Sequence, residues 1–160
     1  RPESHEEIQR RVEKTGQVVS CMIENHRDTL ETLHLDKIYI SSPSGLKLKQ
    51  FKAVNVDSET VCSVLKGSNS SLRQLDLESI YIPYGDEFVV PSTLPQLKEL
   101  KVSDVIPADA GLIIKSSCET LEKLVIKAKG YREVNLANLL NKIKEDNKEL
   151  FDFLFETLEQ

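Results

Sequence analysis

The sequence predicts an α/β fold in which a curved parallel sheet is built from stacked repeat units and carries helices and loops on its convex side. Three observations lead to this fold. The chain of 160 residues holds 21 Leu, no Trp and one Met, so aliphatic side chains must build the core. One spacing of apolar residues recurs in five segments, and a helical face of apolar residues precedes alternate segments. Because one such unit cannot bury its own apolar face, stacked copies are expected to cover one another.

Five segments share the pattern L-x-x-L-x-L, with other aliphatic residues or Phe at some positions, and the first four continue it with Ile or Val at position nine. They begin at Leu30, Leu48, Leu72, Leu97 and Leu121. Their first residues are 18, 24, 25 and 24 residues apart, in or near the ~20–29 residue period of leucine-rich repeats. Side chains alternate along a strand, so the residues at positions four and six point into the core. The sequence therefore predicts a leucine-rich repeat solenoid.

Helices are predicted before the first, third and fifth strands. Apolar residues lie 11 and seven positions before the first leucine of these segments, at Val19 and Ile23, at Val61 and Leu65, and at Ala110 and Ile114. This spacing marks one face of a helix. Asp57 and Asp109 lie where N-caps are expected, and Pro107 favours a helix start nearby. The second and fourth strands follow loops instead, so the repeat is a pair of a helix–strand unit and a loop–strand unit.

The two ends of the chain are predicted separately. Residues 1–14 form either an N-terminal tail or the start of a capping helix, and residues 15–160 form the repeat domain, with five to six strands. At the C-terminal end, residues 150–158 repeat the strand pattern and are preceded by apolar residues at the helix offsets, Leu139 and Ile143. This favours a sixth strand. The alternative is one helical stripe over residues 136–158 that caps the open end.

Composition excludes several classes of protein. The net charge is −5 and the pI about 5.3, with both signs interspersed, so no clustered basic face for nucleic acid is expected. No apolar run is long enough to cross a membrane, and no signal peptide is visible. Cys21, Cys62 and Cys118 lack metal-ligand or disulfide spacing and are interpreted as small buried hydrophobic residues. We expect a reduced compartment, the cytoplasm or the nucleus, and no metal or other cofactor.

Alternation along the strands also predicts which residues form the concave face of the sheet. Positions one, four, six and nine face the core, so positions three, five and seven are displayed. The predicted partner-binding residues are Thr32, His34, Asp36, Gln50, Lys52, Gln74, Asp76, Glu78, Glu99 and Lys101. Such a mixed-charge stripe can bind a protein through polar complementarity, although it lacks the Tyr, Trp and Arg side chains that usually dominate binding energy. The alternative is a merely solvated sheet face.

A second candidate surface is aromatic. Tyr39 and Tyr81 occupy the same phase just beyond two strands, and Tyr84 is close by in the sequence. Together they predict an aromatic edge suited to a protein partner. The alternative is that these rings pack against adjoining loops and help to fill the convex side.

Two further segments connect the repeats with a known family. Residues 94–100, Leu-Pro-Gln-Leu-Lys-Glu-Leu, alternate with residues 116–124, Ser-Ser-Cys-Glu-Thr-Leu-Glu-Lys-Leu, and this resembles the repeat region of F-box proteins. The Cys three positions before Leu121 resembles a recurring Cys of that family. The resemblance implies a protein-binding module that holds a substrate or partner for ubiquitin ligation, with the ligase adaptor bound through a segment outside these 160 residues.

Other functions are weaker alternatives. A structural scaffold without a ubiquitin role stays open, and an extracellular receptor is disfavoured because cysteine-rich caps are absent. His5, His26 and His34 are scattered and have no nucleophile or second ligand at a workable spacing. The sequence therefore predicts no enzyme activity.

Overall fold

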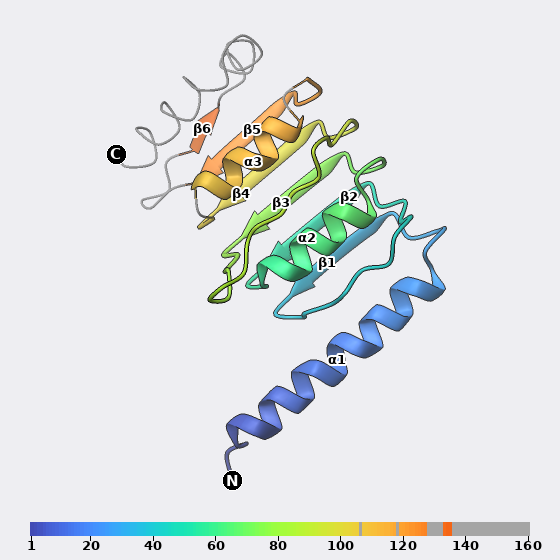
Figure 1. Cartoon of the computed structure of the whole chain (residues 1–160), viewed down its shortest axis with the longest axis vertical. Helices are drawn as coiled ribbons and strands as arrows, with labels where there is room; N and C mark the ends of the chain where they lie inside the picture. The colour runs from blue at the N-terminus through green and yellow to red at the C-terminus, as the bar shows by residue number, and fades with distance from the viewer. Residues whose placement is uncertain (106, 118, 128–132, 136–160) are drawn as a thin grey trace.

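The computed structural model describes residues 1–105, 107–117, 119–127 and 133–135. Its elements in chain order are α1 (His5–Asn25), β1 (Thr32–Asp36), β2 (Gln50–Val54), α2 (Ser58–Gly67), β3 (Gln74–Glu78), β4 (Glu99–Ser103), α3 (Pro107–Ser117), β5 (Lys123–Lys127) and β6 (Glu133–Asn135). The strands form one open sheet in sequential order, as Figure 1 shows. Strands β1 to β5 are parallel, and β6 runs antiparallel to β5. The protein is thus an α/β fold with a parallel sheet.

The five parallel strands pair in a constant register. Counted from the first leucine of each segment, position four of one strand pairs with position four of the next, so that Leu33, Phe51, Leu75, Leu100 and Leu124 form one row. Leu33 in the edge strand is half-buried, and the other four are at most 2% exposed. The residues at position six are all buried as well. Two apolar rows per strand therefore fix one face of the sheet against the core.

Backbone hydrogen bonds repeat with the same period. The carbonyl of Lys49 accepts the N–H groups of Arg73 and Gln74, both at 2.9 Å. Equivalent pairs of bonds reach the carbonyls of Glu31, Arg73 and Lys98 from the next strand. The residue after each of the first four strands is left-handed, with φ between 48° and 56°, at Lys37, Asn55, Ser79 and Asp104. Successive units therefore enter and leave the sheet by the same geometry.

Helices α2 and α3 cover one face of the sheet (Figure 1). Helix α2 begins where the sequence predicts, because the Asp57 carboxylate accepts the N–H of Thr60 at 3.0 Å and caps the helix. The loop of residues 39–46 packs against α2, where the Ile40 N–H donates to Thr60 Oγ1 at 3.2 Å. The loop of residues 81–94 packs against α3 in the same way, and Ser116 Oγ donates to the Pro91 carbonyl at 2.6 Å. Helices and loops thus alternate on this face.

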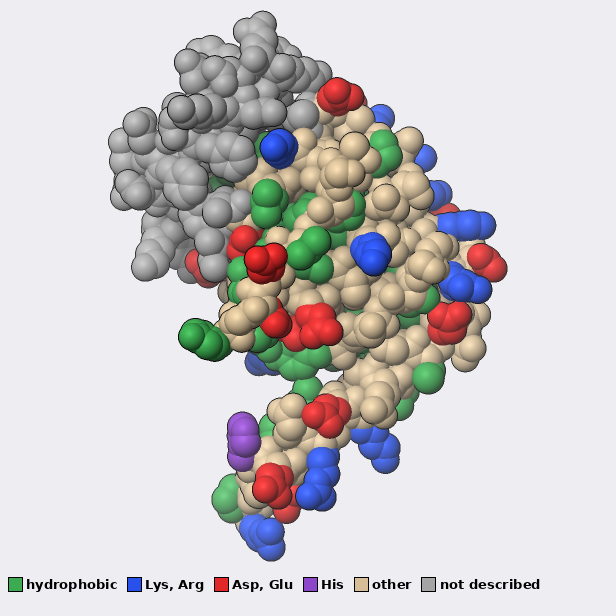
Figure 2. Space-filling view, in the orientation of Figure 1, with side chains coloured by type: hydrophobic (Ala, Val, Ile, Leu, Met, Phe, Trp, Pro, Cys, Tyr) green, Lys and Arg blue, Asp and Glu red, His purple; other side chains and the backbone are tan. Residues whose placement is uncertain are grey.

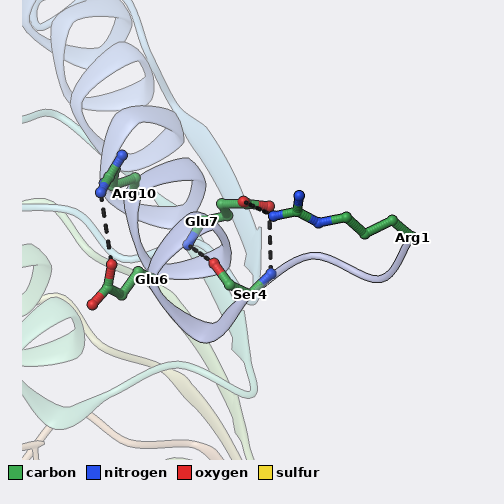
Figure 3. Close-up of polar contacts among 5 residues, drawn as sticks. All are labelled: Arg1, Ser4, Glu6, Glu7 and Arg10. Carbon is green, nitrogen blue, oxygen red and sulfur yellow. Dashed lines mark hydrogen bonds and ion pairs between the residues drawn. The ribbon is translucent and has the colours of Figure 1, made fainter.

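Helix α1 is much longer than α2 and α3, and its N-terminal part projects from the body of the molecule (Figures 1 and 2). It starts with a capping box, in which Ser4 Oγ accepts the Glu7 N–H and the Glu7 carboxylate accepts the Ser4 N–H (Figure 3). Further along, Gly16 is buried, and a Cβ there would clash with the Tyr39 carbonyl oxygen. Residues 5–14 thus form helix rather than an extended tail.

Several details differ from the sequence expectations. Cys21 is exposed, not buried, because it lies on a side of α1 that no described element covers. Cys62 is half-buried, and Cys118 lies outside the described residues. In the first four units position nine is buried at Val56 and Ile80 and only half-buried at Ile38 and Val105. The short antiparallel strand β6 was not predicted, and the segment 150–158 lies outside the described residues.

Candidate functional site

The face of the sheet opposite α2 and α3 carries the ten residues predicted to bind a partner. They come from positions three, five and seven of strands β1 to β4, and each position forms a row that runs across the sheet. In β1 all three residues, Thr32, His34 and Asp36, are exposed. Toward the middle of the sheet the row at position five becomes half-buried, at Asp76 and Lys101. We call this surface the open face.

A shallow depression of about 370 Å³ lies on the open face. The rows at positions three and five line it, and the residues at position four of β1 to β4 contribute to its lining. Glu78 and Asp36, which belong to the row at position seven, lie outside the depression. The depression therefore contains eight of the ten predicted residues, together with Lys123 and Val125 from β5, and runs across all five parallel strands.

Charges of opposite sign alternate along the depression. Lys52 Nζ lies 4.0 Å from Asp76 Oδ2, and Asp76 pairs in register with Lys101 on its other side. One row away, Glu99 pairs in register with Lys123. Opposite charges on directly paired residues stabilise a sheet by roughly 0.2–1 kcal/mol. The face thus satisfies part of its own charge and leaves lysine ammonium groups accessible at the β4 and β5 side.

One residue of the open face departs from the expected exposure. Val125 is at position five of β5, where the strand alternation predicts a displayed side chain, yet it is only 9% exposed. The depression thus has an apolar end beside Lys101 and Lys123. The sequence shows a valine in an otherwise polar row, but it does not indicate that this side chain is buried.

Sequence reasoning missed the charged rim at position two. Lys49 Nζ lies 2.9 Å from Glu31 Oε1, and Lys98 Nζ lies 3.7 Å from Glu122 Oε1. With Arg73 between them, these residues line the edge where the strands enter the sheet. Exposed pairs of this kind contribute little to stability. The signal was present in the repeat pattern, because position two of every unit is charged.

The aromatic edge is only partly assembled. The rings of Tyr39 and Tyr81 meet edge to face, with centroids 6.2 Å apart and an interplanar angle of 76°. Burial and the neighbouring Tyr39 hydroxyl raise the pKa of the Tyr81 phenol. Tyr84, three residues beyond Tyr81 in the loop of residues 81–94, is fully exposed. Tyr39 packs against the core, so the pair combines loop packing with a half-exposed ring at Tyr81.

A second hollow of about 840 Å³ lies between α2 and the loop of residues 85–91, with Cys62 in its wall. Burial raises the pKa of the Cys62 thiol, an effect that the Val89 N–H partly opposes. A raised pKa leaves less thiolate at neutral pH, and the thiolate is the reactive form. This hollow therefore offers no activated nucleophile.

The chain has no match among known proteins in three comparisons. Neither protein-family models, nor curated proteins, nor solved structures match the chain. The part of the chain that the structure describes contains no group of three His, Cys, Asp or Glu residues able to hold a metal ion. Among the described helices, none combines the length and apolar character of a membrane span. The open face is therefore the feature of the described chain from which a function can be inferred.

Proposed function

We propose that this chain is a leucine-rich repeat solenoid whose open face binds a protein partner. One observation carries the proposal: polar side chains, held in register across five parallel strands and of alternating charge between β2 and β5, are left uncovered by the helices and surround a depression of about 370 Å³. The backbone that carries these side chains is already ordered in the sheet, so binding does not have to order it, which favours recognition.

The repeated geometry supports the solenoid. Each unit from that of β2 to that of β5 donates two N–H groups to the position-two carbonyl of the unit before it. The Thr120 hydroxyl donates to the Leu97 carbonyl at 2.8 Å, and the Ser71 hydroxyl donates to the Leu48 carbonyl at the same distance. Each unit therefore contacts its neighbours by the same bonds, as expected of a linear array of repeats.

The chemistry of the face favours a partner with mixed polar groups. Lys101 and Lys123, which lie beside the largely buried Val125, offer charge to a carboxylate-bearing segment. The exposed rows contain no Tyr or Trp, so binding should depend on charge and weaken as salt screens it.

Within this function we propose that the chain is the substrate- or partner-recognition part of an F-box-like ubiquitin ligase receptor. The support is the resemblance of residues 94–100 and 116–124 to the repeats of that family. These two segments also contact each other, since the Leu94 N–H donates to the Ser116 carbonyl at 2.8 Å. The alternative proposal is a scaffold that binds a partner through the same face without leading it to ubiquitin.

The test separates the two levels of the proposal. The protein expressed from its complete gene is isolated from cells, and the ligase adaptor is measured in the eluate together with the other bound proteins. Recovery of the adaptor supports the receptor proposal. Loss of the adaptor with retention of another partner supports the scaffold.

The binding face is tested in the same assay by charge reversal. Lys52→Glu combined with Lys101→Glu should lower recovery of the bound partner about tenfold or more. Each introduced carboxylate repels the acidic group of the partner that the lysine attracts. The matched control is Lys47→Glu combined with Lys66→Glu, which reverses two exposed lysines away from the open face. Equal recovery for both double variants would remove the open face from consideration.

A further inference from the structure

One side of α1 exposes apolar residues that the other two helices bury. Met22 is eight residues before the first leucine of its unit and is 58% exposed. The residues at the same offset, Val64 in α2 and Ile113 in α3, are both 0% exposed. Val18 of α1 is 54% exposed, whereas its equivalent in α2, Thr60, is 1% exposed. At the offset of Met22, α2 and α3 are thus covered and α1 is not, whereas at the offset of Cys21 the α3 residue Leu112 is 40% exposed.

In α2 and α3, the loop of the preceding unit covers this face. The Leu46 N–H donates to the Gly67 carbonyl at the end of α2 at 2.9 Å. The Leu94 N–H donates to the Ser116 carbonyl at the end of α3 at 2.8 Å. Both carbonyls are five residues before the first leucine of their unit. The equivalent residue in α1, Asn25, is exposed.

Strands β1, β3 and β5 each follow a helix, and a hydroxyl-bearing residue lies just before position one of each of these units. The contacts of this hydroxyl also differ between the first unit and the other two. Ser71 and Thr120 donate to position-one carbonyls of the preceding units, those of Leu48 and Leu97. Thr29 is the equivalent residue before β1. Its hydroxyl reaches only the His26 carbonyl of its own unit, at 3.3 Å.

Strand β1 itself has a free edge with the matching groups. In β3, the N–H groups of Arg73 and Gln74 donate to a carbonyl of the preceding strand. The equivalent N–H groups at the β1 edge belong to Glu31 and Thr32, and no strand of the described chain lies on that side. The core residues Leu30 and Leu33 are half-buried, whereas Leu72 and Leu75, their counterparts in the third unit, are at most 2% exposed.

We propose that the surface formed by the exposed side of α1 and the edge of β1 is a docking site for one further loop–strand unit. The occupant is an extended loop followed by a strand parallel to β1, like residues 39–54, which make this same interface with α2 and β3. Its loop covers Met22 and Val18, its leucine N–H reaches the Asn25 carbonyl, and its strand carbonyl receives the N–H groups of Glu31 and Thr32. This site is distinct from the open face and does not depend on what the open face binds.

The test supplies such a unit to the whole chain. A second copy of residues 39–57 is fused before Arg1 through a Gly/Ser linker of about 15 residues, which spans roughly 20 Å. That span matches the extra three turns of α1, about 16 Å. The readout is the rate at which iodoacetamide alkylates Cys21, mapped by mass spectrometry. Cys21 is exposed, and its equivalent Ser63 lies under the loop, where its Oγ accepts the Ser42 N–H at 3.1 Å.

Docking should slow alkylation of Cys21 about tenfold or more, because the thiol then reacts only when the unit opens. The rate at Cys62 should stay unchanged. The control fusion carries Ser at positions 46, 48 and 51 of the copied unit, so that it cannot bury its apolar face. Met22→Glu should abolish the protection in the active fusion, whereas Gln17→Glu, an exposed residue of the same helix, should preserve it.

Two results would overturn the proposal. The first is an equal Cys21 rate in the active and control fusions, with both folded by circular dichroism. The second is protection of Cys21 in the unfused chain that rises with concentration together with a doubled mass by light scattering, because the face would then bind a second copy of the chain.

Discussion

Four of the residues that the structure describes hold a left-handed backbone although none of them is Gly. Lys37, Asn55, Ser79 and Asp104 each follow a strand, with φ between 48° and 56°. This conformation costs most L-residues roughly 1–3 kcal/mol, and Asn and Asp tolerate it best. The backbone bonds at these residues offset the cost, since the Ser79 N–H donates to the Ser103 carbonyl at 2.9 Å. Repetition of the turn keeps all strands in one register.

Substitution at Ser79 tests this geometry. Ser79→Val should lower the free energy of unfolding by about 1–2 kcal/mol, because a β-branched side chain is strained at positive φ. Ser79→Asn should be neutral or slightly stabilising. Urea denaturation followed by circular dichroism measures both changes, with Ser92→Val at an exposed bend as the control. A Val variant as stable as the Asn variant would contradict the role of the turn.

At the scale of single residues, the repeat pattern predicts the face of the sheet to which a side chain points better than it predicts how exposed that side chain is. The rows of the open face follow from strand alternation alone, so Gln50, Lys52 and Gln74 could be placed from the sequence. Burial of Val125 and the exposure of Cys21 could not, because each depends on which neighbouring segment covers that side. The approach of Lys52 to Asp76 likewise depends on side-chain conformations that no spacing encodes.

Among the elements, α1 depends on a close backbone contact. Gly16 lies where α1 meets the Tyr39 carbonyl, and Ser58 occupies the equivalent place in α2, where its N–H donates to the Tyr81 carbonyl at 2.8 Å. The two contacts lie at the same offset from the first leucine of their units. The close approach of the Tyr39 carbonyl therefore favours Gly at position 16, although Gly weakens a helix by about 1 kcal/mol relative to Ala.

Gly16→Ala distinguishes packing from helix propensity by the sign of its effect. Propensity alone predicts a gain of about 1 kcal/mol, whereas the clash of the new Cβ with backbone predicts a loss of about 1–3 kcal/mol. We expect the loss, measured as a lower midpoint of thermal unfolding. Lys14→Ala, at an exposed position of the same helix, serves as the control. A more stable Gly16→Ala variant would show that α1 does not dock at this point.

The elements that belong to the repeat could be predicted, and those outside it could not. Strands β1 to β5 and helices α2 and α3 lie where the spacing of the leucines puts them. The length of α1 and the antiparallel strand β6 follow no repeat. The spacing of apolar residues predicts an element only where a unit recurs, because several copies of the unit then specify the same packing.

At the scale of the whole molecule, the architecture of the sheet has two structural consequences. Its open face displays polar rows around a depression, and its first edge leaves β1 and one side of α1 uncovered. Both consequences arise because helices and loops cover a single face of an open sheet, which creates a displayed face and free edges. The same array that forms the core therefore determines which surfaces of the sheet stay uncovered.

Site-specific photo-crosslinking in cells tests the central claim, that the open face binds a protein partner. A photoreactive amino acid replaces Gln74, which lines the depression, or Lys115, an exposed residue on the opposite, helix-covered side. We predict a discrete protein adduct from position 74 that disappears when Lys52→Glu and Lys101→Glu are added, and no adduct from position 115. An adduct from position 115 alone, or no adduct from position 74, would contradict the account.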